Sequence, residues 1–417
     1  MCRFLTPFPC LLTVLLTGCP SAPPVAEAES GLIPALEIVG SADLFSGGVG
    51  FLALSEDGNT FIAGNENRGV GLYRTSDHAP LERHYECEGE ALATPDGAYS
   101  CNERVSIYDL GYIDANTWYF TAMAFKENDM RVHVRTIHPP QEISVSTVNE
   151  LTHRAIASTN RNYIAYNNEL IDWRTGKRYP TKATVFEPKW PTFPTVTPDN
   201  RIITYPGRKT VIFDPLNDTM ESWKEAARLD ETIIVTPDNR HAIGLSTANY
   251  KCTLWNWPER KKIGHCSERL RGIFGGYPEY LEVLTLSHDG KFFAIGVDNS
   301  VRVYRVEPFK LELEVSTPGP VNTLALSDDG LLAAYDYKGF LRVWDVAIGS
   351  LAGQHKFLDV GWAGMTGYKL LFQPNSNKLF IKRGGITVFE IPKQAAQQKA
   401  KNDSGTRTED EKWRGRR

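Results

Sequence analysis

Two stretches decide how this chain folds: residues 324–334, LALSDDGLLAA, and residues 340–346, FLRVWDV. The first stretch places an Asp-Gly pair between two apolar runs. Asp accepts backbone hydrogen bonds within a turn, and Gly adopts the positive φ that a tight hairpin needs. Leu, Ala, Val and Trp suit a buried pleated sheet. The sequence therefore predicts two strands joined by a tight turn, then a third strand that ends in Trp344-Asp345.

Turns of this kind recur along most of the chain. They fall at Asp57-Gly58, Asp96-Gly97, Thr159-Asn160, Asp199-Asn200, Asp238-Asn239, Asp289-Gly290, Asp329-Gly330 and Asn375-Ser376-Asn377. Successive turns are 39, 64, 39, 39, 51, 40 and 47 residues apart. A repeat of about 40 residues with strand-turn-strand content is typical of a β-propeller blade, a four-stranded sheet that must stack on its neighbours. We therefore expect an all-β fold, a single propeller of four-stranded blades, with eight blades favoured and seven as the alternative.

A third strand with an aromatic residue near its end follows most of these turns. The strands end in Leu72-Tyr73-Arg74, Ile107-Tyr108-Asp109, Ile171-Asp172-Trp173, Ile212-Phe213-Asp214, Leu254-Trp255-Asn256, Val303-Tyr304-Arg305, Val343-Trp344-Asp345 and Val388-Phe389-Glu390. On these residues the chain resembles the WD40-like propeller family over residues 33–393. Trp344-Asp345 matches the family's dipeptide, Gly264-His265 its Gly-His pair, and Asp298 the position of its buried structural Asp. A two-layer sandwich or several small β domains would show less regular spacing and linkers.

The last unit and the longest interval need separate explanations. The last unit offers three strands and stops, and residues 36–39 near the amino terminus, LEIV, would supply the fourth and protect exposed edges. The interval of 64 residues holds an added pair of strands, Trp118–Phe125 and Met130–Arg135. About 25 surplus residues are too few for another blade. We interpret the pair as an extra hairpin on the second blade, and a seven-bladed ring with one decayed unit is the alternative.

The amino terminus has the features of a signal for export. Arg3 precedes an apolar run at residues 11–16, which is too short to span a bilayer as a helix. The run closes on Leu16-Thr17-Gly18-Cys19, which resembles the lipobox of bacterial lipoproteins, in which the peptide is cut before a cysteine that carries the lipid. A plain secretory signal with a chance cysteine is the alternative. Within the lipoprotein family, Pro20 after the cysteine is compatible with sorting to the outer membrane.

This resemblance implies a location and a division of the chain. We expect a signal peptide at 1–18, the lipidated Cys19 with a flexible tether at 19–32, the propeller at 33–393 and a disordered charged tail at 394–417. The protein would sit on the periplasmic face of the cell envelope, at the outer membrane, and touch the membrane through its lipid anchor only. The 41% apolar residues indicate a folded soluble chain, and the net charge of −4 gives no electrostatic case for nucleic acid.

Four of the seven cysteines remain after Cys2 and Cys10 leave with the signal and Cys19 takes the lipid. An even number in an oxidising compartment predicts disulfides. The alternative, preferred for a cytosolic chain, is that the four are small buried apolar residues.

The two expected pairs differ in how well they fit a hairpin. Cys252 and Cys266 flank the turn at residues 258–261 symmetrically, so that a hairpin sets them opposite each other. Cys87 and Cys101 have the same separation, but their midpoint misses the Asp96-Gly97 turn. That second bridge requires the chain before the turn to fold back.

The sequence carries no motif of a known catalytic or metal site. It has no HExxH, CxxC pair, phosphate loop or GxSxG, and its histidines are scattered. Residues 170–179, LIDWRTGKRY, look like a repeat of quinoprotein propellers, but Asp-x-x-Thr-Gly-Lys is also an ordinary turn. We expect no catalytic residue, no metal and no cofactor.

Three connections between successive units are rich in aromatic residues with Pro or Gly: residues 188–194, 274–280 and 361–368. All such connections of a propeller emerge on one face. The predicted partner-binding residues on that face are Trp190, Phe193, Tyr277, Tyr280, Trp362 and Tyr368. Trp and Tyr are enriched where partners dock, and the alternative is that these rings cap neighbouring strands.

These features favour a non-enzymatic scaffold, lipid-anchored in the envelope, that binds protein or peptide partners. A functional analogy is the propeller lipoprotein of the outer-membrane β-barrel assembly machine, although this chain lacks the regular repeat pattern of that family. The alternative function is a propeller enzyme of the lactonase or quinoprotein type with a site at the central channel. Convergent acids, histidines or a metal at the channel mouth would favour the enzyme.

Overall fold

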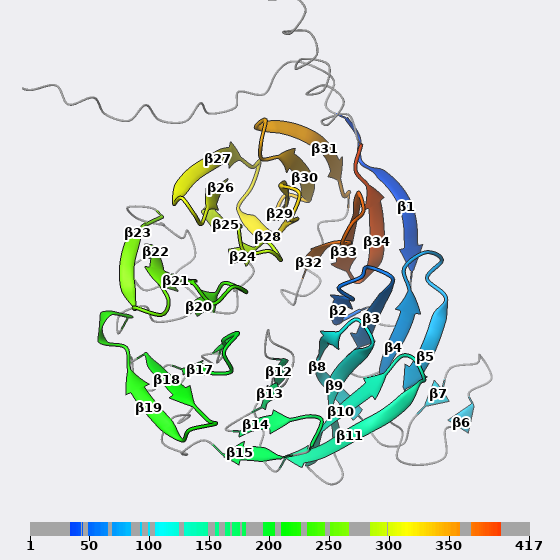
Figure 1. Cartoon of the computed structure of the whole chain (residues 1–417). Helices are drawn as coiled ribbons and strands as arrows, with labels where there is room; N and C mark the ends of the chain where they lie inside the picture. Colours follow the sequence, from blue (N-terminus) through cyan, green and yellow to red (C-terminus); the bar gives the residue numbers. More distant parts are fainter. Residues whose placement is uncertain are drawn as a thin grey trace, which may run out of the picture.

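The computed structural model of the chain describes residues 34–42, 44, 49–65, 69–84, 92–93, 99–100, 105–124, 129–148, 155–157, 163–166, 169–175, 177–180, 195–204, 210–226, 232–246, 251–266, 284–297, 299–358 and 368–392. In this part of the chain the strands form eight four-stranded antiparallel sheets and one two-stranded sheet. The four-stranded sheets stand around a central axis, each with its first strand near the axis and its last at the rim (Figure 1). A propeller of four-stranded blades is therefore confirmed.

The first four sheets occupy the first half of the chain. Sheet 1 contains β2 (Phe51–Leu54), β3 (Thr60–Asn65), β4 (Gly69–Arg74) and β5 (Pro80–His84). Sheet 2 contains β8 (Val105–Asp114), β9 (Thr117–Ala124), β10 (Asp129–Thr136) and β11 (Gln141–Val148). Sheet 3 contains β12 (Ala155–Ala157), β13 (Tyr163–Tyr166), β14 (Glu169–Asp172) and β15 (Arg178–Pro180). Sheet 4 contains β16 (Thr195–Val196), β17 (Ile202–Thr204), β18 (Val211–Asp214) and β19 (Thr219–Ser222).

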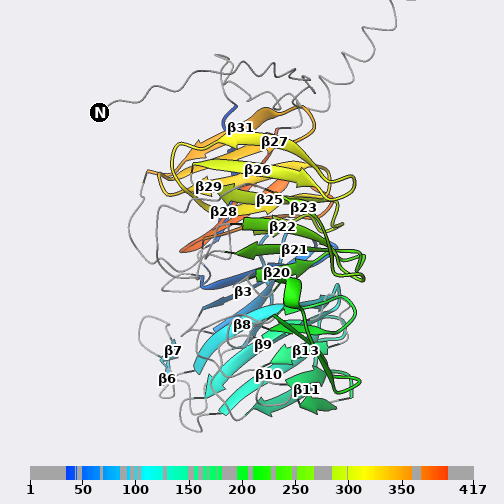
Figure 2. The ribbon, with the colours of Figure 1, turned by 90° about the vertical axis from the view of Figure 1, so that its left-hand side faces the viewer.

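The second half follows the same order (Figure 2). Sheet 5 contains β20 (Thr232–Val235), β21 (His241–Ser246), β22 (Lys251–Asn256) and β23 (Lys261–His265). Sheet 6 contains β24 (Leu284–Leu286), β25 (Phe292–Val297), β26 (Ser300–Arg305) and β27 (Lys310–Ser316). Sheet 7 contains β28 (Val321–Leu326), β29 (Leu331–Asp336), β30 (Phe340–Asp345) and β31 (Ser350–Lys356). Sheet 8 contains β32 (Lys369–Phe372), β33 (Lys378–Arg383), β34 (Gly385–Glu390) and β1 (Glu37–Ala42).

The turns from first to second strand use the chemistry that the sequence predicts. Positive φ angles occur at Gly58, Asn200, Asn239, Gly290, Gly330 and Asn375. A Ser or Thr at the start of most of these turns completes them: in sheet 6 the Ser287 hydroxyl donates to Asp289 at 2.8 Å and accepts the Phe292 N–H at 3.0 Å. Burial raises the pKa of Asp289, but hydrogen bonds from Lys291 and Ser287 outweigh this and hold the pKa below its ordinary value. These carboxylates are therefore engaged by their own turns.

Sheet 2 differs from the prediction. Its first two strands, β8 and β9, meet at a turn in which Asp114 accepts the backbone N–H of Asn116 at 2.8 Å. The strands expected to form an extra hairpin are β9 and β10, the middle strands of the sheet, so that interpretation is wrong. The separate two-stranded sheet, β6 (Leu92–Ala93) and β7 (Tyr99–Ser100), accounts for part of the surplus chain. The Asp96-Gly97 turn itself lies outside the described residues.

The amino-terminal strand closes the ring, as the sequence predicts. β1 pairs antiparallel with β34, with Glu37 opposite Glu390. Just before β1 the chain also joins sheet 7, because the Leu36 N–H donates to the Gln354 carbonyl at 2.9 Å and the Gln354 N–H to the Pro34 carbonyl at 2.9 Å. One short segment thus holds the last two sheets together.

The core lies between neighbouring sheets. Leu36 is buried between sheets 7 and 8 with Leu341 of β30 and Phe389 of β34. Trp223 packs edge-on against Trp255 of sheet 5, with ring centroids 5.2 Å apart, just before the single turn of 3-10 helix η3 (Lys224–Ala226). In the described part of the chain, no helix has the length and apolar character needed to cross a membrane.

We predict that Leu36→Ala lowers the free energy of unfolding by about 2–4 kcal/mol, the usual cost of emptying a buried leucine site. Leu36 is 4% exposed, whereas Ile38 on the same segment is 48% exposed. Ile38→Ala is therefore the matched control and should change the stability by no more than about 0.5 kcal/mol. Denaturant titration of both variants checks this, and equal effects would contradict a closing role for Leu36.

Candidate functional site

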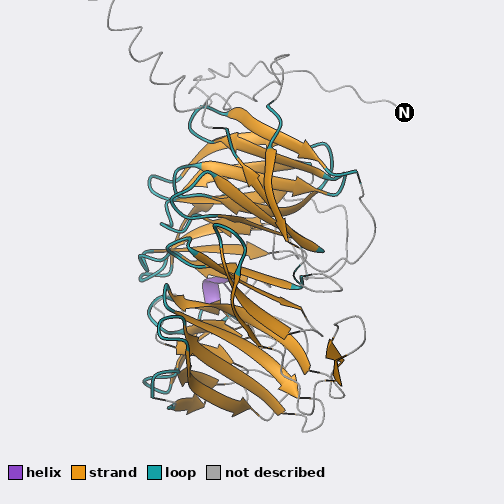
Figure 3. Cartoon of the chain, turned by 90° about the vertical axis from the view of Figure 1, so that its right-hand side faces the viewer, coloured by secondary structure: helices purple, strands orange, loops and turns teal. Residues whose placement is uncertain are grey.

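The two faces of the ring carry different kinds of connection. Because the strands of each sheet alternate in direction, the turns from first to second and from third to fourth strand lie on one face. The turns from second to third strand and the connections between sheets lie on the other. Most of the described loops, drawn in teal, gather along one side of the ring in Figure 3. We name the first face the turn face and the second the connection face.

Most of the predicted partner-binding residues lie outside the described residues: Trp190, Phe193, Tyr277, Tyr280 and Trp362. The strands on either side still define which connections they occupy. These connections run from β15 to β16, from β23 to β24 and from β31 to β32, in each case from the last strand of one sheet to the first of the next. The expectation that they share the connection face stays a prediction.

Tyr368 is described, and it packs at the boundary between sheets 7 and 8. Its ring centroid lies 4.8 Å from that of Tyr335 on β29, which in turn contacts Phe357 at 5.7 Å. Tyr335 is fully buried. Burial, together with Tyr368, raises the pKa of Tyr335 to about 12, although the nearby Arg383 acts in the opposite direction. The rings of Tyr335, Phe357 and Tyr368 form a neutral aromatic layer at this boundary.

Two exposed apolar side chains, which the sequence analysis does not single out, stand beside this layer. Leu358 is 92% exposed and Tyr337 is 41% exposed. Their backbones adjoin, since the Phe357 N–H donates to the Gly339 carbonyl at 3.0 Å within the turn that contains Tyr337. We call Tyr337, Leu358 and Tyr368 the apolar corner. A sequence signal exists only for Tyr337, an aromatic residue at a turn position where polar residues are usual.

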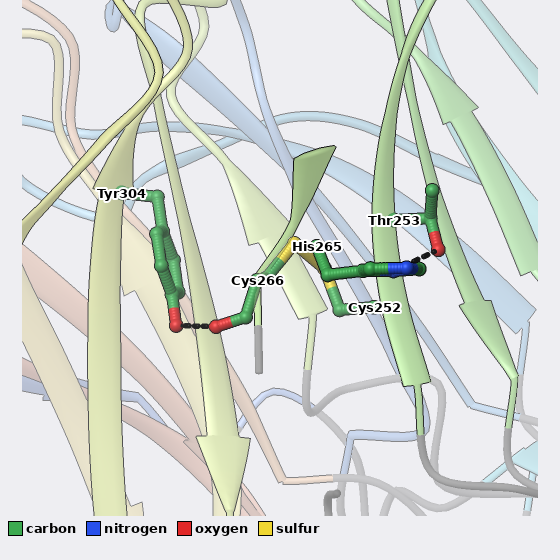
Figure 4. The surroundings of a disulfide bond; sticks show 5 residues. All are labelled: Cys252, Thr253, His265, Cys266 and Tyr304. Atoms are coloured by element: carbon green, nitrogen blue, oxygen red, sulfur yellow. Dashed lines mark hydrogen bonds between the residues drawn. A yellow bond between two sulfur atoms is a disulfide. The ribbon is translucent and has the colours of Figure 1, made fainter. Parts of the chain in front are cut away.

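The disulfide between Cys252 and Cys266 is present, with their Cα atoms 5.0 Å apart (Figure 4). Both residues are buried, and the Cys266 N–H donates to the Cys252 carbonyl at 3.0 Å. The Tyr304 hydroxyl of sheet 6 donates to the Cys266 carbonyl. The bridge therefore fixes the end of β23 to β22 within sheet 5, and the Tyr304 hydrogen bond joins this end to sheet 6, just before the connection that holds Tyr277. Cys87 and Cys101 lie outside the described residues.

The turn face bears on the alternative of an enzyme with a site at the channel. There His288 Nε2 of sheet 6 lies 3.4 Å from Glu56 Oε1 of sheet 1, and both side chains are largely exposed. Within the described residues, no group of three or more His, Cys, Asp or Glu side chains is arranged to hold a metal ion. The turn carboxylates, such as that of Asp57, bind their own turn through Ser55 at 2.6 Å.

This architecture is that of a WD40-like β-propeller. No family model matches the sequence, and no curated protein matches it. Among solved structures, the chain is similar to the C-terminal WD40 domain of Sif2, with a TM-score of 0.59 and 14% identity over 87% of this chain and 100% of that one. It is also similar to the computationally designed Ika8 protein, with a TM-score of 0.54 and 15% identity over 86% of this chain and 99% of that one. At these identities the likeness concerns the fold alone.

For the disulfide we predict a tryptic peptide that joins Cys252 to Cys266 under non-reducing conditions. The bridge closes a loop between two cysteines that are 14 residues apart in the sequence. On the chain-entropy estimate, closing it should raise the free energy of unfolding by about 3 kcal/mol. Reductant should therefore lower the melting temperature of the wild type by more than that of the double variant Cys252→Ser, Cys266→Ser, in which only Cys87 and Cys101 could still form a bridge. Free thiols at both positions in protein purified from the periplasm would refute the bridge and count against the expected compartment.

Proposed function

We propose that the protein is a scaffold, lipid-anchored on the periplasmic face of a bacterial envelope, that binds a protein or peptide partner through its connection face. WD40-like propellers typically serve as protein-binding scaffolds. The observation that carries the choice of face is the 92% exposure of Leu358 beside the exposed ring of Tyr337. Leaving adjoining apolar side chains in water without a partner favours association.

The proposal of an anchor rests on the sequence Leu16-Thr17-Gly18-Cys19 and is tested by chemistry at that cysteine. We predict that Cys19→Ser abolishes labelling by a radioactive fatty acid and leaves a longer, unprocessed precursor, because both cleavage and acylation require the thiol. Labelling followed by electrophoresis measures both effects. Normal labelling of the variant would reject the anchor while leaving partner binding open.

Partner binding is tested by affinity capture from crosslinked cell envelopes. We predict that Leu358→Ala and Trp362→Ala each weaken capture about tenfold or more, as expected for loss of a docking anchor. The melting temperature of Leu358→Ala should stay close to that of the wild type, because an exposed side chain contributes little to stability.

Ile348→Ala is the matched control for this experiment. Ile348 is an exposed apolar residue of the same sheet, 46% exposed, in the turn between β30 and β31 on the turn face. Capture by this variant should equal that of the wild type. If the two connection-face variants capture normally, or if they melt early and lose capture in proportion, their side chains are structural caps and the proposed surface is wrong.

A further inference from the structure

Two cations lie over one aromatic ring on sheet 7, and a third belongs to the turn that leads into the same strand. Lys356 Nζ lies 5.0 Å from the centroid of the Phe340 ring, and Arg342 Cζ lies 5.5 Å from it. Lys356 is the register partner of Phe340 across β30 and β31. Lys338 belongs to the turn that leads into β30. We call Lys338, Arg342 and Lys356 the basic edge.

The loop between sheets 6 and 7 places these cations together. Arg342 Nη1 reaches the Ser316 carbonyl at 3.5 Å, and the Lys338 side chain lies directly over Gly319, where an added Cβ would come within 2.8 Å of Lys338 Cγ. Arg342 and Lys338 therefore share the boundary with sheet 6. Lys338 and Lys356 are exposed, whereas Arg342 is partly buried.

The charge of the basic edge is not neutralised within the described part of the chain. Neighbouring cations are paired: Arg302 with Glu314 at 3.0 Å and Arg305 with Glu312 at 2.6 Å in sheet 6. No described carboxylate forms an ion pair with a member of the basic edge. In a chain with a net charge of −4, this is a local excess of positive charge. Such an excess attracts anionic partners.

The nearby carboxylate of Asp336 is already engaged. Asp336 is buried, and its oxygens accept the backbone N–H groups of Gly319 at 3.2 Å, Lys338 at 2.9 Å and Phe340 at 3.0 Å. Burial lowers the pKa of Arg342, and the charge of Asp336 opposes that effect. Arg342 is thus desolvated without a carboxylate of its own to bind.

Two buried polar atoms at the same place lack hydrogen-bond partners among the described residues. Arg342 Nε is a donor and Gln354 Oε1 is an acceptor, and the two residues face each other across β30 and β31. Leaving a buried donor or acceptor unpaired costs about 1–3 kcal/mol, so such atoms usually mark a place that something else completes. A carboxylate of a partner would give the Arg342 guanidinium the anionic acceptor that the described residues do not supply.

We propose that the basic edge binds a carboxylate-rich segment of the partner protein. The inference rests on the proposed partner binding and adds the chemistry of the partner. The guanidinium of Arg342 would take one carboxylate in its planar fork, and the two lysines would take acidic residues on either side. A protein segment fits better than a bilayer surface, because a single projecting side chain reaches a partly buried guanidinium more readily than a flat layer of headgroups does.

The test uses the purified mature chain and a fluorescein-labelled peptide of alternating Glu and Ala, with binding followed by fluorescence anisotropy. Binding should weaken with added salt, as charge pairing requires. Lys356→Glu should weaken binding about tenfold or more, equivalent to about 1.4 kcal/mol. Lys261→Glu makes the same charge change at another exposed lysine, on the outer strand β23, and should bind like the wild type.

Variants of Arg342 and a membrane control complete the test. Arg342→Gln should lose the peptide and Arg342→Lys should regain part of the binding, with melting curves confirming that both fold. The proposal is overturned if the peptide with Gln in place of Glu binds equally well, if Lys356→Glu and Lys261→Glu bind alike, or if vesicles containing phosphatidylglycerol bind and the peptide does not.

Failure of the basic-edge proposal can be told apart from failure of the scaffold proposal. If the peptide fails to bind while envelope capture still depends on Leu358, the basic edge is rejected and the scaffold proposal stands. If capture is lost by Lys356→Glu but not by Lys261→Glu, the acidic segment belongs to the partner itself.

Discussion

The pairing of β1 with β34 is the constraint on which the rest of the structure depends. A four-stranded sheet buries its two faces only between neighbours, so a row of such sheets is stable when the first and last members also meet. Here the chain meets this requirement with its amino-terminal end, which supplies the outer strand of sheet 8. Leu36 extends the closure to sheet 7 through its backbone and its buried side chain. Closure therefore sets where the chain before β1 meets the ring.

The place where the chain before β1 meets the ring lies on the same sheet as the proposed binding surfaces. Pro34, the first described residue, lies against Gln354 of β31, the outer strand of sheet 7. The same strand ends at Lys356 and leads into Leu358, so the basic edge and the apolar corner begin within a few residues of the attachment point. The segment that closes the ring and the proposed binding surfaces therefore share sheet 7.

Local turn chemistry made much of the fold predictable, and its absence explains the main error. Gly58, Gly290 and Gly330 have the positive φ that their turns require. The turn at Asp114-Ala115-Asn116 contains neither the Asp-Gly nor the Asp-Asn pair that marks most of the other turns, so the strands of sheet 2 were assigned to the wrong pairs. The disulfide was predictable because hairpin symmetry places Cys252 opposite Cys266. The basic edge was not, because Arg342 and Lys356 meet only through the pairing of β30 with β31.

The two faces of the ring differ in the kind of connection that they carry, for a physical reason. Turns from first to second strand are short, and they consume their own polar groups: the Asp289 carboxylate accepts from Ser287 and from the Lys291 N–H. Connections between sheets are longer and span two cores, so their side chains are not all needed to complete a turn. Asn200 Oδ1 and Asn239 Oδ1 of these turns still lack partners among the described residues, as Arg342 Nε does, so it is the turn carboxylates and not every polar group that the turn face engages. The proposed recognition surface uses side chains of β30 and β31, whereas closure at β31 uses the backbone of Gln354, so those side chains would be able to vary while the pairing with Leu36 is kept.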